Sequence, residues 1–449
     1  MTAPAPDRPA PDTPAPDRSA PDRTPAGTRM RWLPVLLRER AFRRYWTGQT
    51  ISGLGDQISS LAIPLVAVLA VHADALQMGY LAAATWLPNL LFALHAGVWA
   101  DRRSHRRRVM IAADLGRFAL VATIPLAYAF DALTLAQLYA VALTAGTLSV
   151  LFDVCDAPLF NALVPPDRYV EGHSLVSGSR AMAQVAGPSI GGVLVQVLSA
   201  PLALLADALS YAASAFALSR IAPAEPPAER KARGQLAEGA RFMLGSPMMR
   251  ASLAATATAN FFTFMLTALL VLYATTVLSL DPGLLGAVLG AGAVGGLLGA
   301  LCATAVTRRM GVGPTFILGT ALYPASLLLI PAAHGTTPVV LALLFAAEFG
   351  AGLGVMWLDV AGASIFAAII PDNLRSRVFG AYRCVNFGTR PLGSLVGGAL
   401  AATIGLRPTL WVAAIGALTS VLWLLPSPIR RLRDLPTPAG QGEGMSDSP

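Results

Sequence analysis

The stretch AQVAGPSIGG, residues 183–192, places Gly187-Pro188 and Gly191-Gly192 within a long apolar segment. Proline removes one backbone hydrogen bond of a helix and crowds the preceding turn, whereas glycine lets a neighbouring helix approach to backbone distance. We therefore expect a helix that bends at Gly187-Pro188 and packs closely at Gly191 and Gly192. Such a helix belongs in a membrane and in a part of the protein that moves.

The composition of the whole chain is that of a polytopic membrane protein. Hydrophobic residues make up 55% of the 449 residues and charged residues only 13%, which is too apolar for a soluble protein of this length. Apolar runs of about 20 residues or more, long enough to cross a bilayer, recur between short polar breaks. Twelve membrane spans are predicted, at residues 45–71, 77–100, 109–130, 135–163, 174–198, 202–220, 251–278, 284–306, 314–332, 338–369, 377–404 and 408–429.

The basic residues predict the orientation of these spans. One set of alternate loops holds nearly all of the arginines, and the loops between them offer a single one, Arg407. Because short cytoplasmic loops retain arginine and lysine, both termini are predicted to be cytoplasmic. This asymmetry and the anionic lipids of the inner surface account for the net charge of +8, so no nucleic-acid partner is expected.

The chain repeats itself. A shift of 206 positions aligns Asp153 with Asp359, Phe160 with Phe366, Pro165 with Pro371, Gly187 with Gly393, and Gly191-Gly192 with Gly397-Gly398. The fold class is therefore all-α, with twelve transmembrane helices in two pseudo-symmetric six-helix bundles. The predicted parts are a Pro-rich cytoplasmic tail (1–28), an N-terminal bundle (29–220), a cytoplasmic linker (221–250), a C-terminal bundle (251–430) and a second tail (431–449).

Two motifs resemble signatures of the major facilitator superfamily. The loop sequence GVWADRRSHRR, residues 97–107, is similar to its loop motif after the second helix, and residues 183–192 resemble its antiporter motif. The antiporter motif goes with export in that superfamily. In the loop motif, Gly97 allows close approach, Asp101 is expected to cap a facing helix, and Arg102 and Arg106 to pair with acids or lipid phosphates. Such contacts would hold the cytoplasmic side in a closed conformation. The alternative is that the arginines only set the orientation of the helices in the membrane.

Further segments resemble one bacterial branch of this superfamily, which includes macrolide-efflux and enterobactin-exporter proteins. They are FRRYWTGQ (42–49), LGDQ (54–57), AADLGR (112–117) and DALS (207–210). The resemblance implies proton-driven export of an amphipathic small molecule across a bacterial plasma membrane. The span 135–163 contains no basic residue, so an arginine that many drug exporters carry there is missing.

Ionisable groups deep in the membrane are candidates for the substrate cavity because they are costly in hydrocarbon. Asp56 lies roughly 18 Å from the cytoplasmic end of its helix, and Glu348 is also deep. Either carboxylate is a candidate for proton coupling, or for a structural hydrogen-bond hub. Arg390 is expected as the counter-charge of one of these acids, in the cavity or in a fixed ion pair. The other predicted cavity residues are Gln57, Asn260, Phe264 and Trp357.

A second group of charges is expected at a cytoplasmic gate. Asp153 and Asp359 are related by the repeat and lie in the cytoplasmic halves of their helices, while Asp114 and Arg117 lie near the cytoplasmic start of theirs. Because the charges gather at one end of the bundles, we predict an inner gate network of these four residues together with Arg383.

The sequence therefore favours a monomeric secondary transporter that exports a small molecule in exchange for protons. An importer, or a lipid or metabolite permease, of the same fold is the alternative. An ATP-driven pump is disfavoured because no phosphate-binding GxxxxGK[ST] loop is present. No enzyme activity and no cofactor are expected, because neither clustered metal ligands nor a nucleophile with a nearby base is recognisable.

Overall fold

The computed structural model describes residues 34–101, 105–222, 235–371 and 374–433, except for the side chains of 93–101, 235–237 and 376. This part of the chain is almost wholly helical and contains no strand. Within it, ten helices are long and apolar enough to cross a membrane. Two further helices, α3 and α14, are of similar length and pack within the bundles, which is consistent with the twelve predicted spans.

Six long helices form the N-terminal bundle. Its core is apolar, and a shared feature of these helices is that several carry an internal proline without being interrupted. Neighbouring helices can satisfy the backbone groups that such prolines free in a membrane. The helices are α2 (Arg40–Leu69), α3 (Ala75–Asp101), α4 (Arg106–Ala129), α5 (Leu135–Leu163), α6 (Tyr169–Leu198) and α7 (Ala200–Ser219).

The C-terminal bundle repeats this arrangement with two small variations. Its third helix is continued by a short segment, α12 (Leu329–Ala332), and its last by the 3-10 turn η2 (Thr419–Trp423). The long helices are α9 (Pro247–Thr276), α10 (Pro282–Met310), α11 (Val312–Leu327), α13 (Thr337–Ile369), α14 (Arg375–Ile404) and α15 (Leu406–Leu418).

Several helices begin earlier than the apolar runs predict. α2 begins at Arg40 instead of 45, and α6 begins at Tyr169 instead of 174. The additional turn of α2 carries Arg40, Arg43 and Arg44, which an apolar-run criterion leaves outside the span. Arginines at a helix end can place their charges in the interface while the helix continues, so the helices extend beyond their apolar parts.

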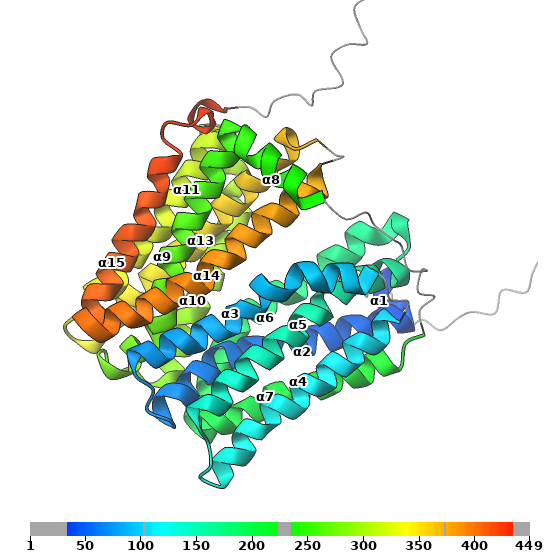
Figure 1. The fold of residues 1–449 in the computed structure, drawn as a ribbon, viewed down its shortest axis with the longest axis vertical. Helices are drawn as coiled ribbons and strands as arrows, with labels where there is room; N and C mark the ends of the chain where they lie inside the picture. Colours follow the sequence, from blue (N-terminus) through cyan, green and yellow to red (C-terminus); the bar gives the residue numbers. More distant parts are fainter. Residues whose placement is uncertain (1–33, 102–104, 223–234, 372–373, 434–449) are drawn as a thin grey trace, which may run out of the picture.

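The two bundles touch at one end and diverge toward the other (Figure 1). We call the converging end, formed by the turns at 70–74, 130–134, 277–281 and 333–336, the turn end. The opposite end carries the linker helix α8 (Gln235–Gly245) and both ends of the described chain, and we call it the linker end. Between the bundles, α3 packs against α14 and α6 packs against α10.

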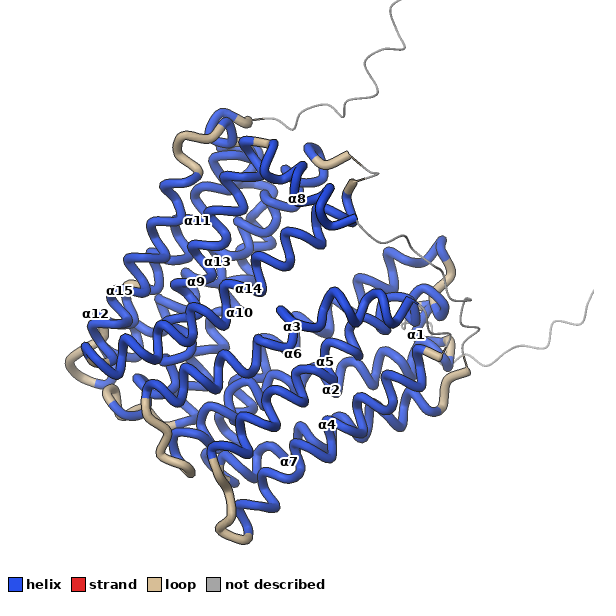
Figure 2. Tube along the Cα trace, in the orientation of Figure 1, coloured by secondary structure: helices blue, strands red, loops and turns tan. Residues whose placement is uncertain are grey.

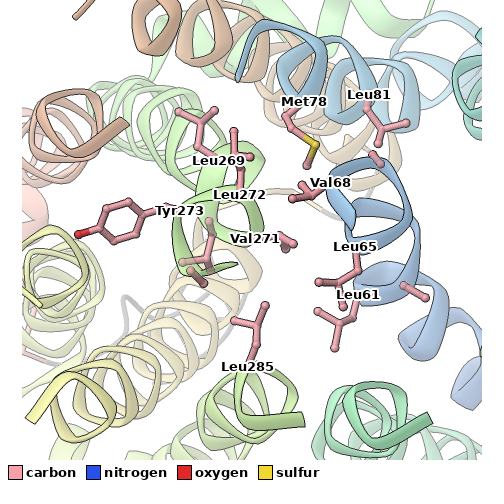
Figure 3. Close-up of a cluster of buried hydrophobic side chains, with 14 of the residues drawn as sticks. Leu61, Leu65, Val68, Met78, Leu81, Leu269, Val271, Leu272, Tyr273 and Leu285 are labelled. Atoms are coloured by element: carbon pink, nitrogen blue, oxygen red, sulfur yellow. The ribbon is translucent and has the colours of Figure 1, made fainter. Parts of the chain in front are cut away.

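An apolar cluster at the turn end joins the bundles. Figure 3 shows Leu65 and Val68 of α2 facing Val271 and Leu272 of α9, with Met78 of α3 beside them. Each of these side chains is less than 10% exposed. Burial of this apolar surface stabilises the contact between the bundles at the turn end.

Short elements cover the linker end (Figure 2). The α1 turn (Val35–Arg38) buries Leu36, whose backbone N–H donates to Glu171 Oε1 at 3.2 Å. Helix α8 packs on α14, where Glu238 pairs with Arg377. The remaining short elements are the 3-10 turns η1 (Pro166–Arg168) and η3 (Pro428–Arg431).

Candidate functional site

The larger cavity lies within the N-terminal bundle and reaches the C-terminal bundle at α9. Its volume is about 400 Å³, which is within the range of small-molecule sites. Asp56 of α2 lines it together with the aromatic side chains of Trp86 from α3 and Phe264 from α9. Most of the other lining residues are apolar, among them Ile63 and Leu81. The cavity thus combines an apolar wall with one solvent-exposed carboxylate.

The Asp56 carboxylate belongs to a chain of polar contacts. The Tyr211 hydroxyl of α7 donates to Asp56 Oδ1 at 2.6 Å. Behind it, the Arg117 guanidinium of α4 lies 4.3 Å from the centre of the Tyr211 ring. Tyr211 and Arg117 are both buried, whereas Asp56 is exposed to the cavity. A change of charge on Asp56 is therefore felt by a buried hydroxyl and, beyond it, by a buried cation.

Arg117 is held in place by its own helix and by α5. It forms an ion pair with Asp114, one turn earlier in α4, and donates to Ser149 Oγ at 3.3 Å. The Phe152 ring covers its guanidinium at 4.7 Å. Asp114 is fully buried and Arg117 is only 3% exposed, so the pair is shielded from water inside the bundle. Breaking one partner of such a pair is costly because it strands a buried charge.

A second carboxylate, Asp207 of α7, lies next to this chain but is fully buried. Ser59 of α2 donates to one of its oxygens, and Ser210 donates to the other at 3.3 Å. Both α2 and α7 therefore contribute to a hydroxyl shell around Asp207. Asp207 also lines the larger cavity, but unlike Asp56 it is fully buried and accepts hydrogen bonds from neutral hydroxyl donors.

Arg390 of α14 lies among aromatic rings instead of acids. Its guanidinium is 4.4 Å from the centre of the Trp86 ring, 4.8 Å from that of Phe264 and 4.5 Å from that of Phe387. The guanidinium also donates a hydrogen bond to Asn386 Oδ1, at 2.8 Å. The rings also contact each other, with Trp86 and Phe264 centres 5.1 Å apart. The arrangement is a cation–π cluster with members from both bundles.

A smaller cavity of about 220 Å³ lies between the bundles, closer to the linker end. Asp153 of α5 lines one wall, and Arg383 and Phe387 of α14 line the other. Arg383 extends over the Phe387 ring, with 5.1 Å between the guanidinium carbon and the ring centre. Phe387 thus contacts both Arg383 and Arg390, and it connects this cavity to the aromatic cluster.

The structure brings some of the predicted cavity residues together and places others elsewhere. Asp56 and Phe264 line the larger cavity, but Gln57 packs against Gly187, and the half-buried Asn260 of α9 lines neither cavity. The Trp357 indole donates to Cys302 Sγ at 3.3 Å inside the C-terminal bundle. Glu348 lies beside Gly292 of α10, also within that bundle. The expected pairing of Arg390 with an acid is absent from the described residues, where the aromatic cluster takes its place.

The residues predicted to form the cytoplasmic gate likewise lie in separate places. Asp153 and Arg383 do face each other across the smaller cavity, whereas Asp359 is exposed on α13 outside it. Asp114 and Arg117 point into the N-terminal bundle, so they do not form a network between bundles in this structure. Arg106 is buried. The remaining predicted gate positions, namely Gly97, Asp101 and Arg102, fall outside the described residues or side chains.

The antiporter-motif residues lie where α6 contacts its neighbours. α6 continues as a helix through Pro188. A Cβ atom on Gly187 would lie 3.1 Å from Gln57 Cγ, and one on Gly191 would lie 3.2 Å from the Ile58 Cα. Gly192 faces α10 across the boundary between the bundles. The glycines therefore allow two different helices to approach α6 closely.

Sequence reasoning missed three members of this site, Tyr211, Asn386 and Phe387. A signal for Tyr211 was present, because it follows Asp207 by four residues and therefore shares its helix face. Phe387 stands midway between Arg383 and Arg390 on one face of α14 by the same spacing. Neither aromatic residue carries a charge at neutral pH, so a search for charges in the membrane passes over both.

Comparison with known proteins agrees with this architecture. A family model described as "transmembrane secretion effector" matches residues 31–439. The multidrug efflux pump Tap of Mycolicibacterium fortuitum is 27% identical, over 86% of this chain and 94% of its own. The staphyloferrin A transporter of Staphylococcus aureus is 23% identical, over 81% and 90%. A solved bacterial homologue of the iron transporter ferroportin, in an inward-facing state, has the same fold, with a TM-score of 0.70 and 15% identity over 86% and 98%.

The family match covers nearly the whole described chain, which folds into two helical bundles. The chain therefore belongs to the major facilitator superfamily, in its family of transmembrane secretion effectors.

Proposed function

We propose that this transporter exports an amphipathic small molecule in exchange for protons, with Asp56 as the group that carries the proton. The observation that carries the proposal is the Asp56 carboxylate, which is exposed in a largely apolar cavity of about 400 Å³ and is bonded to Tyr211. A carboxylate in such a place can bind a proton or face a substrate, and the two states compete.

The proposed transport cycle depends on which end of the molecule faces the cytoplasm. We assign the linker end to the cytoplasm of a bacterial cell, because the arginine-rich loops lie there. The structure, joined at the turn end and divergent at the linker end, then corresponds to an inward-facing state. Substrate binding from the cytoplasm would release the Asp56 proton inward, and rocking of the bundles would expose the cavity outward, where a proton replaces the substrate.

The exporting direction is supported by two observations. The antiporter motif of α6 lies at the contacts between helices that must move, and the relative Tap is named a multidrug efflux pump. The apolar lining of the cavity, with Ile63, Leu81 and Phe264, suits a substrate with a large apolar surface.

The test uses inverted membrane vesicles, whose interior is acidified and monitored with a pH-sensitive dye. A panel of neutral, cationic and anionic amphiphiles is added in turn, and a transported compound should dissipate the gradient. The Asp56→Asn variant should still bind that compound but no longer couple it to protons. Asp167→Asn, which removes an exposed acid in η1, is the matched control.

Two results would contradict the proposal. If no compound in a broad panel releases protons through the unmodified transporter, proton antiport is wrong. If Asp56→Asn couples transport to protons as well as the control variant does, another group carries the proton.

A further inference from the structure

The Arg390 guanidinium lies in the membrane part of the protein, and none of the described acidic residues forms an ion pair with it. A guanidinium has five N–H donors, and within the described part of the chain only one of them has an acceptor, Asn386 Oδ1. Its Nε atom is buried and has no acceptor among the described residues. Aromatic rings stabilise the charge from the face but accept no in-plane hydrogen bonds. The Nε donor of this guanidinium therefore has no acceptor among the described residues, and its charge has no acidic partner there.

A second cation lies on the same face of α14. Arg383 precedes Arg390 by two helical turns, about 10 Å, and it lines the smaller cavity with Phe387. The acid across that cavity, Asp153, forms no ion pair with Arg383 within the described part of the chain. The C-terminal wall of the space between the bundles is thus positive over two turns of α14.

Arg390 itself lines neither cavity, but it contacts aromatic rings that line both of them. Trp86 and Phe264 line the larger cavity, Phe387 lines the smaller one, and Arg390 contacts all three rings. A ligand whose apolar body occupies the larger cavity would therefore lie within reach of this guanidinium. Carboxylate, sulfonate and phosphate groups match its planar donors, and the pairing is strong where water is limited.

We infer that Arg390 is the anchor for an acidic group of the substrate, so that the exported compounds are amphipathic anions. This inference rests on the proposed function, because it names the chemical class of the same cargo. The distribution of charge supports this inference. The acids that line the larger cavity, Asp56 and Asp207, lie in the N-terminal bundle, whereas Arg383 and Arg390 lie on α14 in the C-terminal bundle. The acidic group would then bind on the C-terminal wall, and the apolar body of the compound would lie in the cavity that Asp56 lines.

Arg390 also contacts a residue of the other bundle. Trp86 belongs to the N-terminal bundle, whereas Arg390, Phe264 and Phe387 belong to the C-terminal bundle. An acidic group bound at Arg390 would adjoin the one ring of the cluster that comes from the other bundle. Occupancy of the site and the relative position of the bundles are thereby connected through Trp86, which contacts Arg390, Phe264 and Phe387.

The test compares two dyes of the same body, anilinonaphthalene sulfonate and the uncharged N-phenylnaphthylamine. Both are titrated into the full-length transporter in lipid nanodiscs, with empty nanodiscs subtracted. Arg390→Gln should weaken sulfonate binding by about 10-fold to 100-fold, the value of a charge-assisted hydrogen bond, and should leave the neutral dye within about twofold. Arg390→Lys should restore part of the loss.

The control is Arg309→Gln, which removes an equal charge from the exposed linker end of α10 and should change neither affinity. Unchanged sulfonate binding in Arg390→Gln would overturn the inference, and so would an equal loss for both dyes, which would give Arg390 a structural role only. Because these are binding measurements, they are independent of the vesicle assay. Proton-coupled transport of neutral or cationic compounds alone would leave export intact and contradict the anionic cargo.

Discussion

The backbones of Gly192 in α6 and Gly286 in α10 meet at the boundary between the bundles. A Cβ atom built on Gly192 would lie 3.0 Å from the Gly286 Cα. The same relationship recurs on the other side of the molecule, where a Cβ atom on Gly79 of α3 would lie 2.9 Å from the Gly398 Cα of α14. Gly192 and Gly398 are equivalent positions of the repeat. Two glycine crossings, related by the internal symmetry, therefore join the bundles near the turn end.

Substitution at one crossing should hold the turn end open. In Gly192→Leu the side chain would meet the backbone of α10, which cannot move aside without separating the helices. We expect a cysteine introduced at Ser60, which lines the larger cavity, to become reactive toward an impermeant maleimide from the turn end. The three native cysteines, Cys155, Cys302 and Cys384, are replaced first.

The matched control for this experiment is Gly178→Leu in the same helix, because a Cβ atom at Gly178 would meet nothing within 4 Å. It should leave the labelling pattern unchanged. If both leucine variants label alike, the Gly192 crossing does not determine closure of the turn end.

Much of the fold was predictable because its determinants are local. Apolar length and the arginine bias are properties of single segments, and the repeat that aligns Gly192 with Gly398 needs no knowledge of the structure. The partners of these glycines were not predictable. Gly286 and Gly79 are two glycines among 41 in the chain, and only the packing of α10 and α3 identifies them as the facing residues.

The site was less predictable because depth along a helix does not say which way a side chain points. Asp114 and Arg117 lie near the start of their span, so the sequence favours a gate, but the rotation of α4 turns them into the bundle. Arg390 was identified as a cavity cation, yet its partners come from three different helices. Contacts between distant segments, such as that between Trp86 and Arg390, follow only from the assembled fold.

Substitution of two glycines in α2 by alanine should change the stability of the protein in opposite directions. A Cβ atom on Gly55 would lie 2.8 Å from the Ser210 Cβ, next to Asp207, whereas one on Gly53 would meet nothing within 4 Å. Gly55→Ala should destabilise the protein by about 1–3 kcal/mol through overpacking. Gly53→Ala should be neutral or stabilising by up to about 1 kcal/mol, because alanine favours the helix.

Thermal unfolding in one detergent measures both variants under identical conditions. An equal shift of the unfolding temperature in the two variants would contradict the close contact between α2 and α7 at Gly55.

The Asp114–Arg117 pair should be required for stability. Asp114→Asn leaves the Arg117 charge buried without its counter-charge, and the expected loss is about 3–5 kcal/mol. The double variant Asp114→Leu with Arg117→Met removes both charges and should recover a large part of that loss. Unfolding temperatures and the yield of monodisperse protein provide the measurement. A double variant less stable than Asp114→Asn would show that the pair is more than a mutual neutralisation.

The Tyr211 hydroxyl should matter for transport more than for folding. Tyr211→Phe keeps the ring beneath the Arg117 guanidinium but removes the donor to Asp56, whose carboxylate can still bind cavity water. We expect stability to fall by about 1 kcal/mol, the net value of one hydrogen bond, and proton-coupled transport to fall by about tenfold. Initial rates in inverted vesicles and unfolding temperatures are measured on the same preparation.

Tyr139→Phe is the comparison for this variant, because the Tyr139 hydroxyl donates at 3.1 Å to a backbone carbonyl, that of Gln77, and contacts no acid of the cavity. It should lose similar stability and retain its transport rate. If the two variants transport alike, the hydrogen bond from Tyr211 to Asp56 is not required for proton coupling.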